Sequence, residues 1–242
     1  MALTKVIGDG TGDITKLQIL NGSNVRAASS DADDLIVEGP ADCGISILSA
    51  TTGRIYFGDA ANDDAGSIRY VHSDDSMRFE TNDVEAMRIS SIGAVTKPLQ
   101  PAFLAYASGY QNNIAVGSDV TVVFDTEVFD QNSDFASNTF TAPVTGRYQL
   151  QTTVRVQDMT NASVYYYMQL VTSNRAYLSS IIDPRAFDAD PSYFTMHITI
   201  LADMDASDTA FVRIVQHSGT QQTDIQGGSS EHSTHFSGYL VA

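Results

Sequence analysis

The chain has 242 residues and a formal net charge of -16, because 29 acidic side chains outnumber 13 basic ones. A surface of that sign repels the phosphates of nucleic acid and of anionic lipid, so neither is expected as a partner. No stretch approaches the roughly 20 apolar residues that cross a bilayer, and the first residues lack the apolar core of a signal peptide, so we expect a soluble chain without membrane insertion.

Composition favours an all-β fold. Trp is absent, while Val, Ile, Tyr and Phe are spread along a chain rich in Thr, Ser, Asn, Asp and Gly, which is typical of strands joined by turns. The single cysteine, Cys43, excludes a disulfide framework within the chain and any multi-cysteine zinc site.

Residues 1–30 are rich in Gly, Asn, Ser and Thr, and we expect them to form an N-terminal attachment arm rather than part of a core. The run GDGTGD at 8–13 is similar to phosphate-binding and calcium-binding loops. No Lys-Ser/Thr pair follows its glycines, and Leu20 stands where an EF-hand loop needs a bidentate Glu. A flexible turn is therefore the favoured interpretation.

Residues 31–97 contain strand candidates of only three to five residues: LIV, ISIL, RIYF, SIRYV and MRFE. Gly, Asn and Asp turn signals separate them. Hairpins this short expose their edges and bury too little apolar surface to be stable alone. The segment needs partners, and the simplest partners are further copies of itself.

The run HSDDSMRF at 72–79 places a histidine, two serines and two aspartates close together. A nucleophilic serine would need a base within hydrogen-bond reach and an oxyanion hole. The alternation instead predicts a hairpin with Ile68, Tyr70, Met77 and Phe79 on one face and HSDDS as its polar turn. No catalytic residue is expected, and the chain is not expected to be an enzyme.

Pro98 and Pro101 mark a linker at 98–101, and residues 102–242 contain longer strands. Residues 146–157 alternate with a period of two, and we expect Phe194–Ile200 and Phe211–Val215 to pair as a hairpin around the turn DMDASD. Further strand candidates lie at 103–108, 120–129, 163–171, 175–182 and the C-terminus. Eight or more such strands indicate a sandwich or a jelly roll.

Aspartates and histidines in this part raise the question of a metal. Two loops carry hard oxygen donors for calcium, and three histidines could converge on zinc. Soluble turns and ordinary polar histidines are commoner, so no cofactor is expected and calcium is kept as the weaker alternative. The calcium candidates are Asp183, Asp188 and Asp190, with Asp203, Asp205 and Asp208 in the second loop, and the histidines are His217, His232 and His235.

The stretch NTFTAPVTGRYQLQTTV at 138–154 resembles the C1q/TNF-like family, whose pattern runs from an aromatic residue through Ala-Pro to Gly-x-Tyr. The ending THFSGYLVA and the run VVFDTEVFD at 122–130 are similar to other strands of that family. The resemblance implies a ten-stranded jelly roll that assembles as a homotrimer, while the long loop DPRAFDADPS departs from the family pattern. The residues that carry it are Phe140, Pro143, Gly146, Tyr148, Phe236, Gly238 and Tyr239.

The run Tyr165-Tyr166-Tyr167 sends rings to both sides of one strand. One side must be core, and tyrosines on the other side would suit a subunit interface. With the trimer that the resemblance implies, we hypothesise that Tyr165 and Tyr167 lie toward the three-fold axis.

Residues 31–97 resemble repeats of bacteriophage tail-fibre and related virion proteins, through the runs RIYFGD, GSIRYVH, SMRFETN and MRI. Such proteins often end in a self-cleaving chaperone domain, which is not found here. The resemblance implies an intertwined β shaft, for which the jelly-roll head would bring three chains into register.

These observations predict a structural virion protein on the tail or capsid surface, with an arm that contacts other virion proteins. The head would bind a host surface glycan or protein. One alternative is a capsid-decorating or stabilising fibre whose head acts mainly as a trimerisation domain. Another is a cellular C1q-like binding module, which would predict a signal sequence and a collagen-like stalk that the sequence does not show.

Overall fold

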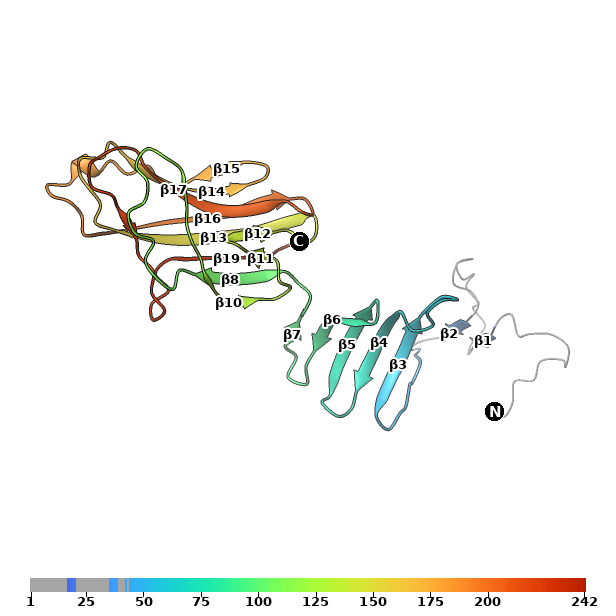
Figure 1. The fold of residues 1–242 in the computed structure, drawn as a ribbon. Helices are drawn as coiled ribbons and strands as arrows, with labels where there is room; N and C mark the ends of the chain where they lie inside the picture. Colours follow the sequence, from blue (N-terminus) through green and yellow to red (C-terminus); the bar gives the residue numbers. More distant parts are fainter. Residues whose placement is uncertain (1–16, 21–34, 39–41, 43) are drawn as a thin grey trace. The chain divides into compact units, whose positions relative to one another are not determined.

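The computed structural model describes residues 17–20, 35–38, 42 and 44–242, and strands dominate these residues (Figure 1). The chain divides into two compact units, residues up to 83 with 89–94, and residues 84–88 with 95–242. One short 3-10 helix, Pro184–Ala186, interrupts the strands of the described residues. No helix within these ranges has the length and apolarity that a membrane span requires.

Near the N-terminus, β1 (Leu17–Leu20) pairs in parallel with β2 (Leu35–Glu38). The expected arm at 1–30 therefore contains one short strand. The GDGTGD run and Cys43 lie outside the described residues, and so does the rest of the arm.

A second sheet consists of β3 (Thr52–Phe57), β4 (Gly66–Val71), β5 (Ser76–Thr81), β6 (Val84–Ile89) and β7 (Val95–Thr96), in that order. The expected hairpin is confirmed, because Ile68 lies opposite Phe79 and Tyr70 opposite Met77. The strand expected at 45–48 is wrong, since these residues form no ladder. Ile47 lies instead over Gly53, where a side chain would approach it within 3.3 Å.

The two faces of this sheet differ in character. One face carries the cross-strand row Ile55, Ile68 and Phe79. The opposite face carries a row of arginines, Arg54, Arg69 and Arg78. Arg69 is paired with Glu80, and Arg78 lies 2.5 Å from Asp74, which offsets the repulsion between like charges in one row. The sheet is amphipathic, with an apolar face and a charged face.

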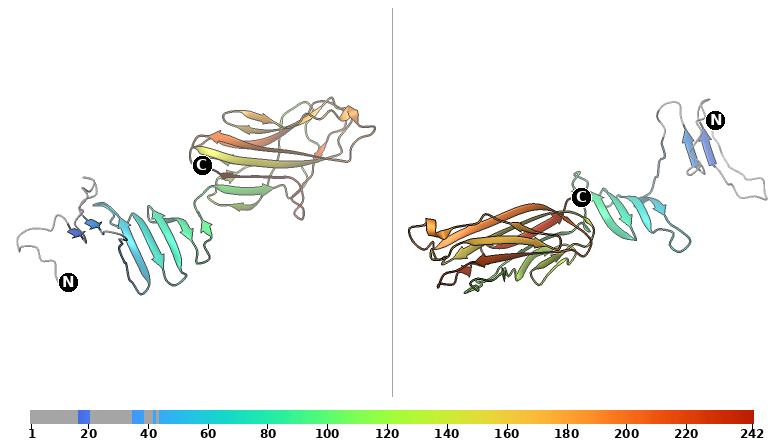
Figure 2. Two further views of the ribbon diagram at one scale, coloured as in Figure 1. Left: turned by 180° about the vertical axis from the view of Figure 1, so that it is seen from behind. Right: turned by 90° about the horizontal axis from the view of Figure 1, so that it is seen from above.

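Residues 102–242 form a jelly roll of two antiparallel sheets (Figures 1 and 2). The first, the β13 sheet, has the order β10 (Thr126–Asp130), β8 (Ala102–Tyr106), β19 (His235–Leu240), β13 (Gly146–Gln157) and β16 (Tyr193–Met204), with β18 (Asp224–Ile225) also paired to β13. The second, the β17 sheet, has the order β11 (Phe135–Ala136), β12 (Thr139–Thr141), β17 (Thr209–Gln216), β14 (Tyr166–Thr172) and β15 (Ala176–Leu178), with β9 (Val120–Thr121) paired to β17.

Aromatic rings from both sheets fill the core at one end of the sandwich. Phe103 of the β13 sheet stacks on Phe140 of the β17 sheet at a ring distance of 4.8 Å. Phe236 meets Phe103 edge-on at 5.0 Å, and Tyr148 lies 5.4 Å from Phe140. These four side chains are fully or almost fully buried. Rings in such offset and edge-on pairs contribute about 0.5–1.5 kcal/mol each beyond their buried area.

Two glycines make this packing possible. A side chain on Gly238 would come within 2.5 Å of Leu150 and 2.9 Å of Phe103, so the ring can sit against the backbone of β19 only because Gly238 has no Cβ. At the start of β13, a side chain on Gly146 would come within 2.6 Å of Leu240. Both positions therefore require glycine for close approach rather than for backbone freedom.

The strand expected at 146–157 is confirmed over its whole length as β13, with its predicted apolar face buried. The hairpin expected between Phe194–Ile200 and Phe211–Val215 is wrong, because β16 and β17 belong to different sheets. The strand expected at 120–129 is also divided between sheets, with β9 in one and β10 in the other. Val122 and Phe124 are buried where the chain crosses between them.

The aromatic cluster generates a stability prediction. Replacing Phe236 by Ala leaves a cavity among Phe103, Phe124 and Phe135, and we expect a loss of about 3–5 kcal/mol in the free energy of unfolding, measured by urea denaturation. Phe187→Ala is the control, because this ring is 39% exposed and its loss should change stability by less than about 1 kcal/mol. An equal loss in the two variants would contradict the assignment of this core.

Candidate binding surface

The residues that carry the family resemblance mostly hold the fold. Phe140, Tyr148 and Phe236 are core side chains, and Tyr148 donates its hydroxyl to the Val144 carbonyl at 2.7 Å. Burial raises the pKa of Tyr148. Pro143 is exposed in the turn before β13, and Tyr239 points outward from β19. These residues position strands, so a ligand site has to be sought on the loops and the outer faces.

Four loops lie together at the end of the jelly roll opposite the C-terminus (Figures 1 and 2). We call residues 109–119, 158–165, 183–192 and 217–223 the crown loops. Hydrogen bonds join them: the Asn161 amide donates to the Asp190 carboxylate at 2.6 Å, and the Val164 amide donates to the Ser218 hydroxyl at 3.1 Å. The crown is thus one connected structure rather than four separate loops.

Buried polar side chains order the crown from below. Gln216 is fully buried and donates to the carbonyls of Ser218 and Gln221 at 3.2 and 2.7 Å, while its own oxygen accepts from the Thr223 amide at 3.0 Å. The Tyr166 hydroxyl lies 2.8 Å from the Thr223 hydroxyl, and burial raises the pKa of Tyr166. No sequence motif identifies Gln216 as a residue that orders the crown, because this role depends on its burial below the loop.

The calcium candidates do not converge. Asp183 caps the short helix and forms a bidentate pair with Arg185 at 2.8 Å for both contacts, and the Arg185 side chain lowers the pKa of Asp183. Asp190 accepts from the Asn161 amide, and Asp188 lies exposed between them in sequence. In the part of the chain that the structure describes, no three Asp, Glu, His or Cys side chains are placed to hold a metal ion.

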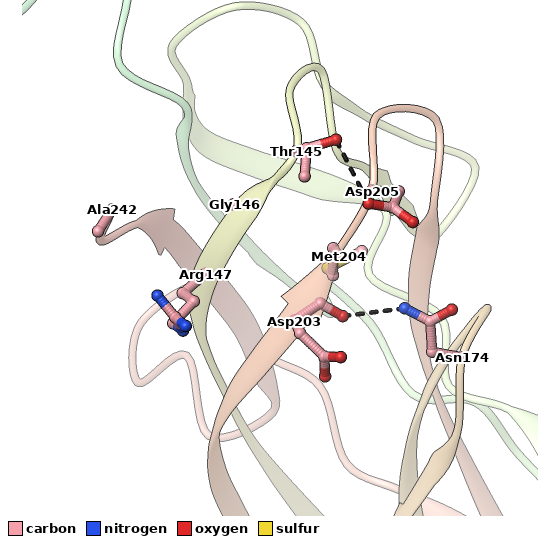
Figure 3. Close-up of a pocket in the computed structure, with 8 residues that line it drawn as sticks. All are labelled: Thr145, Gly146, Arg147, Asn174, Asp203, Met204, Asp205 and Ala242. Carbon is pink, nitrogen blue, oxygen red and sulfur yellow. Dashed lines mark hydrogen bonds between the residues drawn. The ribbon is translucent and has the colours of Figure 1, made fainter.

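The second aspartate loop borders an open cavity of about 270 Å³ near the C-terminus (Figure 3). Thr145 donates to Asp205 at 3.4 Å, and Asn174 donates to the Asp203 carbonyl at 3.0 Å. The Asp203 carboxylate pairs with Arg175 at 2.9 Å, while Asp208 accepts from Asn174 and from the Asp205 amide. These carboxylates serve the turn between β16 and β17.

The three histidines lie against different partners. His217 packs against Tyr165 at a ring distance of 4.3 Å, whereas His232 stacks on Tyr106 at 3.9 Å. His235 Nδ1 lies 2.8 Å from the His232 carbonyl. His235 and His232 are therefore neighbours through the backbone, and His217 follows β17 of the other sheet.

The run HSDDSMRF is arranged as a turn. The Ser76 hydroxyl donates to Asp74 at 2.8 Å and accepts from Arg78, and the His72 ring meets Tyr70 edge-on. Among the residues that the structure describes, no serine of this run is hydrogen-bonded to a histidine. The geometry contains a charged hairpin end and no nucleophile–base pair.

The outer face of the β17 sheet carries Tyr165 and Tyr167. Tyr166 between them is fully buried, so the expected division of the three rings between core and surface is confirmed. The two outward rings stack at 5.9 Å with an interplanar angle of 22°. Both are partly exposed in the single chain, and whether they lie at a three-fold axis stays a prediction.

The outer face of the β13 sheet carries no charge at its centre. Three cross-strand rows run over β16, β13, β19 and β8, and they contain no Asp, Glu, Lys or Arg. Leu201 and Tyr239, on either side of Gln149, are 54% and 52% exposed. The rows are Leu201–Gln149–Tyr239–Ala102, Thr199–Gln151–Ser237–Leu104 and His197–Thr153–His235–Tyr106.

The described residues of the C-terminal part thus form a two-sheet jelly roll with connected loops at one end. Residues 102–241 match the family model of the C1q domain. This match covers more than half of the chain, and the chain belongs to the C1q domain family. No enzyme family is indicated, and no curated protein matches the chain in sequence.

Two solved structures are similar in fold. The globular domain of zebrafish complement 1qA protein has a TM-score of 0.43 and 13% sequence identity, covering 59% of this chain and 98% of that chain. Murine APRIL at pH 8.5 has a TM-score of 0.41 and 11% identity, covering 59% of this chain and 99% of that chain.

Two carboxyl groups of the jelly roll have opposite environments. Burial, and then the nearby charge of Asp130, raise the pKa of Asp134, one of whose oxygens is buried without a partner among the described residues. Hydrogen bonds from the Ser108 hydroxyl and amide, both 2.7 Å long, lower the pKa of Asp125. Ionised Asp134 therefore opposes folding, whereas ionised Asp125 favours it.

These shifts predict opposite pH dependences. Asp134→Asn should raise the melting temperature at pH 7, because it removes an ionised group that the folded state disfavours, and the gain should vanish as pH falls below about 4, where the carboxyl is protonated in both the folded and the unfolded chain. Asp125→Asn removes the same charge but should lower the melting temperature at pH 7, and its loss should shrink on acidification. Gains of equal sign in both variants would point to net charge alone.

Proposed function

We propose that this protein is a homotrimeric, non-enzymatic fibre or spike of a bacteriophage virion, whose C1q-like head binds a component of the host surface. The observation that carries the proposal is a jelly roll of a family of binding modules joined to an amphipathic sheet of short hairpins. The amino-acid sequence of those hairpins supports a location on the virion, since it resembles tail-fibre repeats. Residues 1–30 would attach the fibre to other virion proteins.

The three cross-strand rows without charged residues on the outer face of the β13 sheet, which we call the uncharged field, support self-association of the heads. Charged residues are depleted at the centre of interfaces, and aromatic residues are enriched there. In a chain with 29 acidic residues, three neighbouring rows without a charge are therefore informative. Leu201 and Tyr239 would be the buried contacts, and a trimer agrees with the typical assembly of C1q-like domains.

The hairpin sheet supports the shaft. Its apolar row exposes Ile55 by 47%, and Phe57 on the same face by 57%. Burying apolar surface contributes about 25 cal/mol per Å², so this face is unfavourable in water and favourable against two further copies. The arginine face would remain toward solvent with its acidic partners.

Three-fold symmetry gives the binding function its strength. Each trimer presents three copies of the crown loops, including 183–192 and 217–223, so weak contacts with a repetitive host surface add through effective concentration. Binding residues commonly lie on loops held by a rigid scaffold, which is the arrangement of the crown.

The assembly is tested by paired variants of the full chain. The double variant Leu201→Asp, Tyr239→Asp places two charges in the uncharged field. We expect the dissociation constant of the trimer to rise at least about a hundredfold. Light scattering after size-exclusion chromatography measures the mass. Leu178→Asp, at an exposed leucine of β15, is the matched control and should remain trimeric.

The same measurement separates the two outer faces. An intact trimer in the Leu201→Asp, Tyr239→Asp variant, with monomers for Tyr165→Ala, Tyr167→Ala, would assign the interface to the tyrosines of the β17 sheet. A monomeric wild-type chain would contradict the proposed assembly.

The virion role is tested on particles. Antibody raised against this chain should label projecting fibres in electron micrographs, and purified trimer added before infection should reduce particle adsorption because it occupies the host component. Labelling without competition would favour the decorating role, in which the head mainly trimerises the shaft. Absence of label from the particles would remove the virion proposal.

A further inference from the structure

We infer that the outer face of the β17 sheet, together with the adjoining crown residues Tyr165 and His217, is a binding site for a neutral sugar unit of a glycan. The site consists of the rings of Tyr165, Tyr167 and His217 with the polar side chains of Gln169, Arg213 and Asp119. The inference rests on the proposed function in one respect, that the head is a binding module, and it names the surface and the ligand class.

Three rings form the apolar part of this surface. The Tyr165 and Tyr167 rings are near-parallel with their centroids 5.9 Å apart, and the His217 ring centroid lies 4.3 Å from that of Tyr165. The His217 amide donates to the Tyr165 carbonyl at 3.1 Å, which fixes the relative position of the two residues. Val215, opposite Tyr167 in the ladder, is only 6% exposed. The rings thus form a fixed platform over the strand.

The polar part adjoins the platform on the same face. Gln169 lies opposite Arg213, whose Nε donates to the Gln169 oxygen at 2.7 Å. Arg213 also donates to Asp119 at 2.5 Å. The contact between Arg213 and Gln169 uses the side-chain amide oxygen of Gln169, so the NH2 group of Gln169 is left as a donor. Within the part of the chain that the structure describes, that NH2 group and the hydroxyls of Tyr165 and Tyr167 make no hydrogen bond.

This combination fits a pyranose ring. A sugar presents a face of C–H groups, which carry partial positive charge and suit the negative face of an aromatic ring. Its hydroxyls need a few fixed donors and acceptors at the edge of the contact, and those are the amide and phenol groups just described. The rings already contact one another without a ligand, so less side-chain ordering opposes binding.

Charge selects a neutral sugar over an acidic one. The cation of this surface, Arg213, is balanced by Asp119 and engaged by Gln169, so it is not available to pair with a sulfate or carboxylate. The chain as a whole carries a formal net charge of -16, which repels anionic polysaccharides at a distance. An uncharged hexose or N-acetylhexosamine is the class that meets no repulsion.

The surface is less suited to contact with another copy of this chain. Packing a second protein against it would cover unpaired donors and an ion pair, and each polar group left unsatisfied costs about 1–3 kcal/mol. The rows of the β13 sheet contain polar side chains but no charged residue, so covering them buries no ion pair. Assigning the two outer faces to different tasks leaves the platform accessible, next to the crown.

The test uses the full-length protein on an array of immobilised oligosaccharides of glucose, galactose, mannose and N-acetylglucosamine, with heparin and polysialic acid as anionic comparators. We expect binding to at least one neutral sugar, and a loss of about tenfold or more in affinity for Tyr165→Ala, Tyr167→Ala, because two ring contacts are removed. Tyr165→Phe, Tyr167→Phe keeps the rings and should retain more of the affinity than the alanine pair.

Two further variants guard against misfolding. Gln169→Glu keeps the shape of the side chain and its contact with Arg213 but replaces the donating NH2 group by an acceptor, so binding should fall while the melting temperature is maintained. Tyr110→Ala removes a tyrosine that is 48% exposed on a crown loop outside the platform, and it should bind like the wild type.

The inference is overturned if no neutral sugar is bound, if heparin or polysialic acid is preferred, or if Tyr165→Ala, Tyr167→Ala binds unchanged. Dissociation of the trimer in that variant would likewise overturn it and identify the platform as the subunit interface. If the wild-type trimer competes for adsorption yet binds no neutral sugar, the proposed function stands and this site does not.

Discussion

The contact of Phe103 with Phe140 joins the two sheets of the jelly roll, Phe236 packs edge-on against Phe103, and the rest of the head depends on this cluster. Side chains of a strand alternate between faces with a period of two. Once these rings are buried between the sheets, the alternate side chains of β8, β12 and β19 must point outward. The register of the ladders then fixes which side chains of the neighbouring strands point outward as well. The outward faces are thus consequences of the core, and Gly238 is required because it admits the Phe103 ring.

Local patterns predicted the strands well and their pairing less well. Alternation in 146–157 identified β13 with its buried face, and Gly-x-Tyr identified Gly146 and Tyr148 as structural positions. The same alternation did not reveal that β16 and β17 lie in opposite sheets. A period of two in the apolar residues shows that a strand has one buried face, but it does not show which strand is its hydrogen-bonded neighbour. The break between β9 and β10 was hidden for a similar reason, since Val122 and Phe124 stay apolar where the chain crosses the core.

Motifs of reactive residues were poor guides to binding surfaces in this chain. Asp183 and Asp190 are hydrogen-bonded within the crown and Ser76 within its turn, and His217 lies apart from the neighbouring His232 and His235. Gln216, which orders the crown, has no motif, because its role depends on burial below a loop. The uncharged field of the β13 sheet was equally hidden, since its rows combine strands from four distant parts of the sequence. Tyr165 and Tyr167 were accessible to sequence reasoning, because one strand suffices to separate them from Tyr166.

The direction of the strands has a mechanical consequence. The chain enters the jelly roll at Ala102 on β8, and β8 runs between β10 and β19 toward the end that carries the crown. A pulling force between a ligand held at the crown and the chain before Ala102 therefore runs along the strands. It loads the ladder hydrogen bonds on both edges of β8 together, in shear, instead of opening them one after another. Under the proposed function, this geometry would keep the head folded while a bound surface pulls on it.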